Sequence, residues 1–240
     1  MKFPYNMIIS FEGLDCCFKE TNYKAFVNRL RLEYPDKKIE TASFPRYHDV
    51  ASYFVSQYLS GECYDRSKLK NRNDIVDSFF ALDRFDYWYA ASEKGNMKST
   101  KKHELDCDPC CFIFDRYTLS NAIYNTLDGQ FPTAEDICFD YDHFNVPLPD
   151  IVVWMRMRNF DKIVELLLKK KDKDANELDI NYLRIVWERS ERLINSDLLD
   201  EEGIDLVVIE CLDDNGEIKS KEELEKEVYD KISIYINNER

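Results

Sequence analysis

Short apolar runs alternate with longer segments that mix apolar and charged residues along this chain. Apolar runs of this length, bounded by turn residues, are typical of strands that are buried on both faces. We predict strands at Met7–Phe11, Lys38–Ser43, Cys111–Phe114, Ile151–Met157 and Ile204–Ile209.

Between these runs, apolar residues recur every three to four positions, which predicts helices. The predicted helices are Glu20–Arg31, Asp49–Ser60, Asn73–Lys94, Ser120–Leu127, Phe160–Lys171, Ile180–Asn195 and Lys219–Ile236. Residues 95–108 are polar and predict a loop, and residues 129–147 have a mixed character that predicts no single element. The alternation favours an α/β fold, a doubly wound five-stranded parallel sheet flanked by helices in one domain that spans residues 1–240.

Composition narrows the possible functions. The chain has 240 residues, 44% of them hydrophobic, with a net charge of −14 and a pI near 4.8. Such an acidic protein is a poor candidate for binding nucleic-acid polymers, which requires a basic surface. An anionic substrate would need a local basic pocket.

Targeting signals are not evident in the sequence. No apolar run approaches the roughly 18 residues of a membrane span, and we expect neither a signal peptide nor membrane binding. We therefore expect a cytoplasmic protein with reduced cysteines. A zinc site that joins Cys107 and Cys110 to Cys63, His103 or Cys111 is an alternative, but the simpler interpretation is that Cys110 and Cys111 are small buried residues.

The loop after the first strand carries a partial phosphate-binding motif. Gly13 and Lys19 have the spacing of a P-loop, whose glycine admits phosphate and whose lysine binds it. Phe18 replaces the second glycine, and Glu20 replaces the metal-binding hydroxyl, with Thr21 one residue later. A plain strand-turn-helix corner with an exposed lysine is the alternative.

Charged residues follow two other predicted strands. Arg46 and Arg116 lie just beyond the strands that end at Ser43 and Phe114, where ligands bind in such sheets, and Arg84 lies on a predicted helix. Converging arginines would suit a phosphate, whereas each one alone could equally form a surface ion pair. Asp115, at the end of a buried strand, could hold Mg²⁺ or cap the next helix.

Taken together, these segments resemble the thymidylate kinase family of P-loop nucleoside monophosphate kinases, with a degenerate Walker A motif. The matching segments, in family order, are FEGLD at Phe11–Asp15, FPRY at Phe44–Tyr47, YLSGE at Tyr58–Glu62, FFALDR at Phe79–Arg84, DRYTLSNA at Asp115–Ala122 and Pro149-Asp150. The likeness covers nearly the whole chain.

The resemblance implies a site for the acceptor dTMP. Arg46 and Arg84 would hold its phosphate, and Arg116 would reach the transferring phosphoryl group. The other implied acceptor residues are Phe80 stacked on the base, Phe44 beside it, Asp15 at the sugar 3′-hydroxyl, Glu12 near the phosphate, Tyr124 near the sugar, and Ser120 and Asn125 at the base edge.

The resemblance also implies a site for ATP and Mg²⁺. The implied ATP-binding residues are Gly13, Cys16, Cys17, Phe18, Lys19, Glu20 and Thr21, with Lys170 and Lys173 in a mobile lid at about residues 166–180. Glu20 and Asp115 are the implied Mg²⁺ ligands. Cys16 stands where some members carry an arginine, so a lid cation would replace that charge. Members of this family are generally homodimers.

Two functions remain open at this stage. The first is a kinase that converts dTMP and ATP into dTDP and ADP, with Lys19, Arg46, Arg84, Arg116 and Asp15 as its catalytic residues. The second is a weak or inactive relative that binds a nucleotide or a protein partner. Another acceptor, such as dUMP, or another donor is also possible.

Overall fold

The computed structural model describes residues 2–61, 64, 66–69, 72–89, 98–101, 104–106, 110–125, 130–171 and 179–237. Its centre is a parallel sheet of five strands in the order β2-β5-β1-β6-β7. The strands are β1 (Met7–Glu12), β2 (Lys38–Ser43), β5 (Cys110–Asp115), β6 (Ile151–Arg156) and β7 (Asp205–Glu210). The order changes direction beside β1, so the loops after β1 and β5 meet at the carboxyl edge where ligands bind in such sheets.

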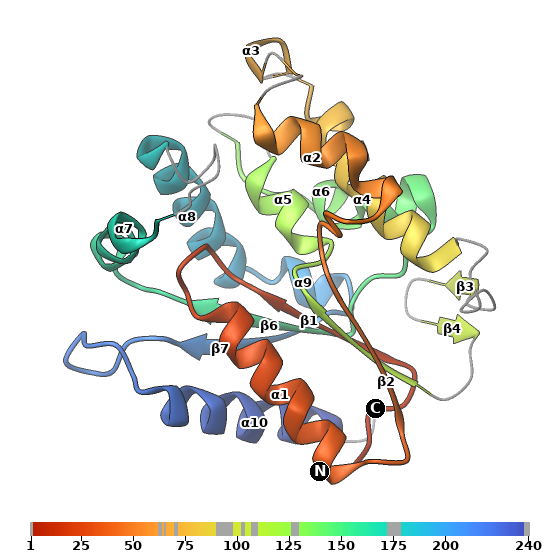
Figure 1. Cartoon of the computed structure of the whole chain (residues 1–240), viewed down its shortest axis with the longest axis vertical. Helices are drawn as coiled ribbons and strands as arrows, with labels where there is room; N and C mark the ends of the chain where they lie inside the picture. The colour runs from red at the N-terminus through yellow and green to blue at the C-terminus, as the bar shows by residue number, and fades with distance from the viewer. Residues whose placement is uncertain are drawn as a thin grey trace.

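Helices cover both faces of this sheet (Figure 1). The helices, with one 3₁₀ turn η1, are α1 (Lys19–Glu33), η1 (Val50–Ser52), α2 (Tyr53–Ser60), α3 (Arg66–Leu69), α4 (Asn73–Tyr89), α5 (Leu119–Tyr124), α6 (Ala134–Phe144), α7 (Phe160–Lys169), α8 (Ile180–Ile194), α9 (Leu198–Glu201) and α10 (Lys221–Asn237). Helices α1 and α10 pack together on one face, and α4, α5, α6 and α8 lie on the other. The predicted doubly wound α/β fold is therefore confirmed.

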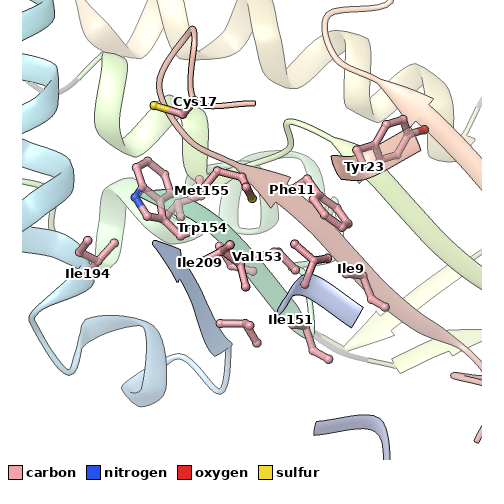
Figure 2. Packing of buried hydrophobic residues seen from close by; sticks show 14 of the residues in the cluster. Ile9, Phe11, Cys17, Tyr23, Ile151, Val153, Trp154, Met155, Ile194 and Ile209 are labelled. Carbon is pink, nitrogen blue, oxygen red and sulfur yellow. The ribbon is translucent and has the colours of Figure 1, made fainter. Parts of the chain in front are cut away.

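The central strands are apolar because both of their faces are covered. Every residue of β5 is buried, and β1 and β6 are buried over most of their length. Figure 2 shows side chains of this core, in which Cys17 from the loop after β1 belongs to the same cluster as Trp154 and Met155. The loop is thus anchored to the core next to β6.

The segment 129–147, for which no element was predicted, contains helix α6. Thr133 and Asp136 form a reciprocal capping box at its start, with the Asp136 amide donating to Thr133 Oγ1 at 3.3 Å. Ile137 and Cys138 are buried one turn further on. The Thr-x-x-Asp cap was the signal that could have revealed this helix.

A second correction concerns the predicted loop at 95–108. Its described residues form two short antiparallel strands, β3 (Lys98–Lys101) and β4 (Glu104–Asp106), in a small separate sheet. Cys63, His103 and Cys107, which the zinc alternative requires, lie outside the described residues. Cys110 and Cys111 are buried as predicted, and no group of three possible metal ligands occurs within the part of the chain that the structure describes.

The first and last residues that the structure describes, Lys2 and Asn237, lie side by side, and both chain ends are seen below the sheet in Figure 1. The amide of Lys2 donates a hydrogen bond to Asn237 Oδ1 at 2.8 Å. Among the described residues, no helix combines the length and the hydrophobicity that crossing a membrane requires.

Candidate functional site

The loop that joins β1 to α1 needs a glycine at its start. Gly13 has φ +148°, and a Cβ atom there would lie 2.8 Å from the carbonyl oxygen of Met155 on β6. Side chains rarely adopt that φ and would not fit in that space. Gly13 therefore lets the loop backbone lie directly on the neighbouring strand.

Two residues of the same loop have left-handed backbone conformations without being glycine. Cys16 has φ +65° and Phe18 has φ +58°. This conformation costs a non-glycine residue of order 1–2 kcal/mol. Phe18 precedes α1, and its side chain packs against the buried core. At Phe18 the chain thus follows a left-handed path where the P-loop pattern has its second glycine, and core contacts of Phe18 help to offset the cost.

Lys19, the first residue of α1, points to the end of β5. Its Nζ donates a hydrogen bond to Asp115 Oδ1 at 2.7 Å, and both side chains are 11% exposed. Burial and the nearby charge of Arg116 lower the pKa of Lys19, while Asp115 opposes that shift. The lysine and the strand-end carboxylate therefore form a nearly buried pair beside the loop.

Arg116 links the ends of β5 and β1. Its guanidinium contacts the Asp15 carboxylate at 2.5 Å and donates to the Gly13 carbonyl oxygen at 3.2 Å. Burial alone would raise the pKa of Asp15, but the charges of Arg116, Lys19 and Lys170 outweigh it and lower that pKa. Asp15 is thus an anion among three cations, and these cations are the basic groups that this acidic protein brings to the carboxyl edge of the sheet.

A cavity of about 310 Å³ opens beside this group. Its lining residues are Asp15, Ser43, Phe44, Pro45, Tyr47, Leu59, Phe80, Asp115, Arg116, Ser120, Asn121, Tyr124, Asn125 and Lys170. The cavity has aromatic and apolar walls as well as charged groups. It brings together nine of the residues that were predicted as site residues from the sequence: Asp15, Phe44, Phe80, Asp115, Arg116, Ser120, Tyr124, Asn125 and Lys170.

Arg46 does not line this cavity. Carboxylates surround it: it pairs with Asp83 at 2.9 Å, with Asp49 at 2.9 Å and with Asp86 at 2.7 Å. One guanidinium thus faces three carboxylates, so the local charge is negative. The structure places the predicted phosphate-binding Arg46 in an ion-pair network instead of in the cavity wall.

Arg84 does not line the cavity either. Its side chain is 2% exposed, and its Nε lies 2.5 Å from Oδ2 of Asp140, which is 1% exposed. A second contact joins Arg84 to Asp140 Oδ1 at 3.1 Å. The predicted phosphate-binding role of Arg84 stays a prediction, because in this structure a buried carboxylate is its partner. Arg84 instead ties α4 to α6.

Glu12 is fully buried at the end of β1. Its two carboxylate oxygens accept hydrogen bonds from the Tyr117 amide and from Ser120 Oγ, both at 2.7 Å. Burial raises the pKa of Glu12, and these hydrogen bonds and the charge of Arg116 counteract the shift. Glu12 therefore acts on the cavity indirectly, since it fixes the segment after β5 that carries Ser120.

The two implied metal ligands lie in different environments. Asp115 lines the cavity, whereas Glu20 is exposed on α1 and pairs with Lys24. Thr21 is exposed as well, and Lys173 lies outside the described residues. Mg²⁺ commonly binds one or two carboxylates, several waters and substrate phosphates. Asp115, beside Asp15 at the cavity, fits that donor set, and the structure brings no contact from Glu20 to it among the described residues.

Several polar residues around the cavity were not predicted from the sequence. Asp77 on α4, Asn121 on α5 and Asp140 on α6 are all buried. Asn121 Nδ2 donates to the backbone oxygen of Asp77 and to Asp140 Oδ1, both at 3.3 Å. Asp77 and Asp140 belong to no motif, and Asn121 lies in the DRYTLSNA segment without a role predicted for it. Their partners lie far away in the sequence, so only the fold brings them together.

The strand order, the glycine-lysine loop after β1 and the cavity at the carboxyl edge define an α/β fold of the P-loop nucleoside monophosphate kinase type. Two solved structures make the class more specific. A thymidylate kinase from Candida albicans matches with a TM-score of 0.63 and 16% identity over 97% of this chain and 93% of that one. A thymidylate kinase from Ehrlichia chaffeensis matches with a TM-score of 0.60 and 17% identity over 96% and 100%. This chain therefore has a thymidylate kinase-like fold.

Sequence comparisons add nothing to this likeness. No protein-family model matches the chain, and no curated protein matches its sequence. The resemblance that the sequence motifs predicted is thus confirmed at the level of the fold.

Proposed function

We propose that this protein is a nucleoside monophosphate kinase that transfers the γ-phosphoryl group of ATP to dTMP and forms dTDP and ADP. The observation that carries the proposal is the cavity, which joins aromatic walls from Phe44 and Phe80 to the charged group around Arg116. A nucleotide needs both features, because its base is flat and apolar while its phosphate is anionic.

The cavity residues have separate tasks in this proposal. Phe80 stacks on the base, Arg116 holds the acceptor phosphate toward the loop, and Lys170 acts on the donor side as the lid cation. Lys19 binds the phosphates of the donor, and Asp115 would hold Mg²⁺, which neutralises charge on those phosphates when bound. Phosphoryl transfer depends mainly on positioning and on charge stabilisation, and these residues supply both.

Calorimetry tests this proposal directly. We would titrate the protein separately with dTMP and with ATP–Mg²⁺, and then measure ADP release in a coupled assay. Binding of both nucleotides and dTMP-dependent release of ADP are expected. Binding of dTMP without any turnover would instead support a nucleotide-binding relative, and binding of neither nucleotide would refute both functions.

The second function, a catalytically weak relative, rests on the altered loop. Lys19 is paired with Asp115, and Glu20 is paired with Lys24 on the exposed side of α1. In a P-loop, the Ser or Thr that follows the lysine supplies a hydroxyl ligand to Mg²⁺. Glu20 occupies that position here and has no hydroxyl group. The altered loop therefore favours weaker handling of ATP.

The variant Glu20→Thr restores that hydroxyl and separates the two functions. We expect a gain in kcat and tighter binding of ATP–Mg²⁺, because a carboxylate close to the loop repels phosphate. The measurement is ADP release at saturating dTMP. A loss of activity would show instead that Glu20 contributes to metal binding.

We expect Lys170 to be the lid cation, because it lines the cavity. It also lowers the pKa of both Asp15 and Glu20. We expect Lys170→Ala to lower kcat by about tenfold to a hundredfold. The change in the Kd of ATP should be smaller, because the lysine would stabilise the charge of the transition state more than that of bound ATP. Lys226→Ala, which removes an exposed charge from α10, is the control. Equal kinetics in the two variants would exclude Lys170 from the reaction.

Four further expectations extend the proposal. Residues 166–180, of which 172–178 lie outside the described residues, would act as a lid over the donor, in a single domain of residues 1–240. The protein works in the cytoplasm as a homodimer, and exposed apolar side chains on α2 and α4, namely Tyr53, Phe54, Leu82 and Phe85, suit an interface. Sedimentation as a monomer would refute the dimer.

A further inference from the structure

One wall of the cavity contains a buried carboxylate that the proposed reaction does not use. Asp77 on α4 is 8% exposed and does not line the cavity itself. Its Oδ1 accepts a hydrogen bond of 2.7 Å from Nδ2 of Asn125, which follows α5 and does line the cavity. Asp77 thus stands directly behind a polar group of the cavity wall.

This contact fixes how the Asn125 amide is turned. An ionised carboxylate can only accept hydrogen bonds, so it must face the NH₂ end of the amide and not the oxygen. Within the described parts of the chain, no residue donates a hydrogen bond to Asn125 Oδ1. That oxygen is therefore the hydrogen-bond acceptor that Asn125 keeps available for a ligand.

The surroundings of Asp77 hold it in place. Asn121 on α5 donates to the backbone oxygen of Asp77, and Arg84, also on α4, is fixed by its ion pair with Asp140. The charged groups that act on the Asp77 carboxyl are Arg84 from its own helix and Asp140 and Asp136 from α6. Three helices, α4, α5 and α6, which are neighbours in Figure 1, thus meet around this carboxylate.

We propose that Asp77 is a positioning residue that sets the base preference of the acceptor site. It turns Asn125 so that the amide oxygen is available to the cavity, and this oxygen selects a base with a ring N–H donor. Thymine and uracil carry such a donor at N3, whereas cytosine has an acceptor there. This inference rests on the proposed function, because it assigns the cavity to a nucleoside monophosphate.

The preference should depend on pH in a defined direction. Burial raises the pKa of Asp77 to about 7, and the hydrogen bond from Asn125 opposes the shift while Asp140 adds to it. Above that pH the carboxylate is ionised and holds the NH₂ group. Below it the protonated carboxyl can donate, so the amide can reverse and present its NH₂ group to the cavity. The preference for thymine over cytosine is therefore greatest above pH 7 and decreases below it.

The experiment compares Kd values of dTMP, dUMP and dCMP, measured by calorimetry at pH 6 and pH 8. The ratio of the dCMP value to the dTMP value is the readout, because both ligands share the same phosphate and its protonation cancels. The variant Asp77→Asn keeps the shape of the side chain but can face either end of the Asn125 amide. The control is Asp74→Asn, which makes the same change at an exposed position of α4.

For the native protein and the control, the ratio should favour dTMP at pH 8 and fall several-fold at pH 6, with dUMP following dTMP. In Asp77→Asn the ratio at pH 8 should fall by about tenfold, the value of one hydrogen bond replaced by a mismatch. In this variant the ratio of the two Kd values should also be the same at pH 6 and pH 8.

Three outcomes would overturn the proposal. Equal weakening of dTMP and dCMP in Asp77→Asn would show a purely structural role. A pH-independent ratio in the native protein would contradict the reversal of the amide, and this measurement needs no variant. Failure of all three nucleotides to bind the native protein would refute the proposed function, and the inference with it.

Discussion

Replacing Lys19 with methionine is expected to reduce kcat for dTMP-dependent ADP release by about 10²- to 10³-fold, the usual effect of removing one preorganised charge from a transition state. Methionine keeps the apolar stem but removes the charge that contacts Asp115 at 2.7 Å. Binding of dTMP should change little, because Lys19 is not among the residues that line the cavity. Steady-state kinetics and dTMP calorimetry provide the two measurements.

The control for Lys19→Met is Lys221→Met on α10, where the lysine is 63% exposed and pairs with Glu225 one turn away. That variant should retain native kinetics, since an exposed pair of this kind contributes little. Thermal unfolding of both variants separates lost chemistry from lost folding. Unchanged turnover in a folded Lys19→Met protein would remove the lysine from the mechanism.

Replacing Arg84 with methionine is expected to destabilise the protein by about 3–5 kcal/mol, because removing one partner leaves a buried carboxylate without its counter-charge. Arg84 and Asp140 are 2% and 1% exposed, and two contacts of 2.5 and 3.1 Å join them. For a chain of this size the melting temperature should fall by about 6–20 °C. Differential scanning calorimetry measures it.

A double variant distinguishes a lost ion pair from simple loss of packing. Asp140→Asn in the Arg84→Met background removes the unpaired charge and keeps an oxygen that can accept from Asn121. Most of the lost stability should return. Arg72→Met, which breaks an exposed pair with Asp74, should change stability by less than about 1 kcal/mol. A native melting temperature in Arg84→Met would contradict the structural role, and a selective rise in the Kd of dTMP would restore the acceptor role.

The strands could be predicted closely from the sequence. Parallel strands that are buried on both faces need uninterrupted apolar runs, and Cys111–Phe114 and Ile151–Met157 are such runs. Helix α6 was missed because its apolar residues stand among aspartates and aromatic residues, and only the cap at Thr133 marks its start. The hairpin of β3 and β4 has polar strands without apolar alternation, so its pattern predicted a loop.

The candidate site was only partly predictable, because a motif specifies a residue but not its partners. The motifs placed Asp15, Phe80 and Arg116 around one cavity, as the structure does. They could not indicate that Asp140, 56 residues away, would occupy Arg84. The pairing of Asp77 with Asn125 likewise depends on the packing of α4 against its neighbours, which no local pattern encodes.

The meeting of the two chain ends has a practical consequence. Lys2 and Asn237 lie beside the beginning of β1, while the cavity lies at the opposite, carboxyl edge of the sheet. A fusion partner, affinity tag or surface tether attached at either end would emerge away from the cavity. A short peptide could also join the ends, so that circularly permuted forms with an open cavity become accessible.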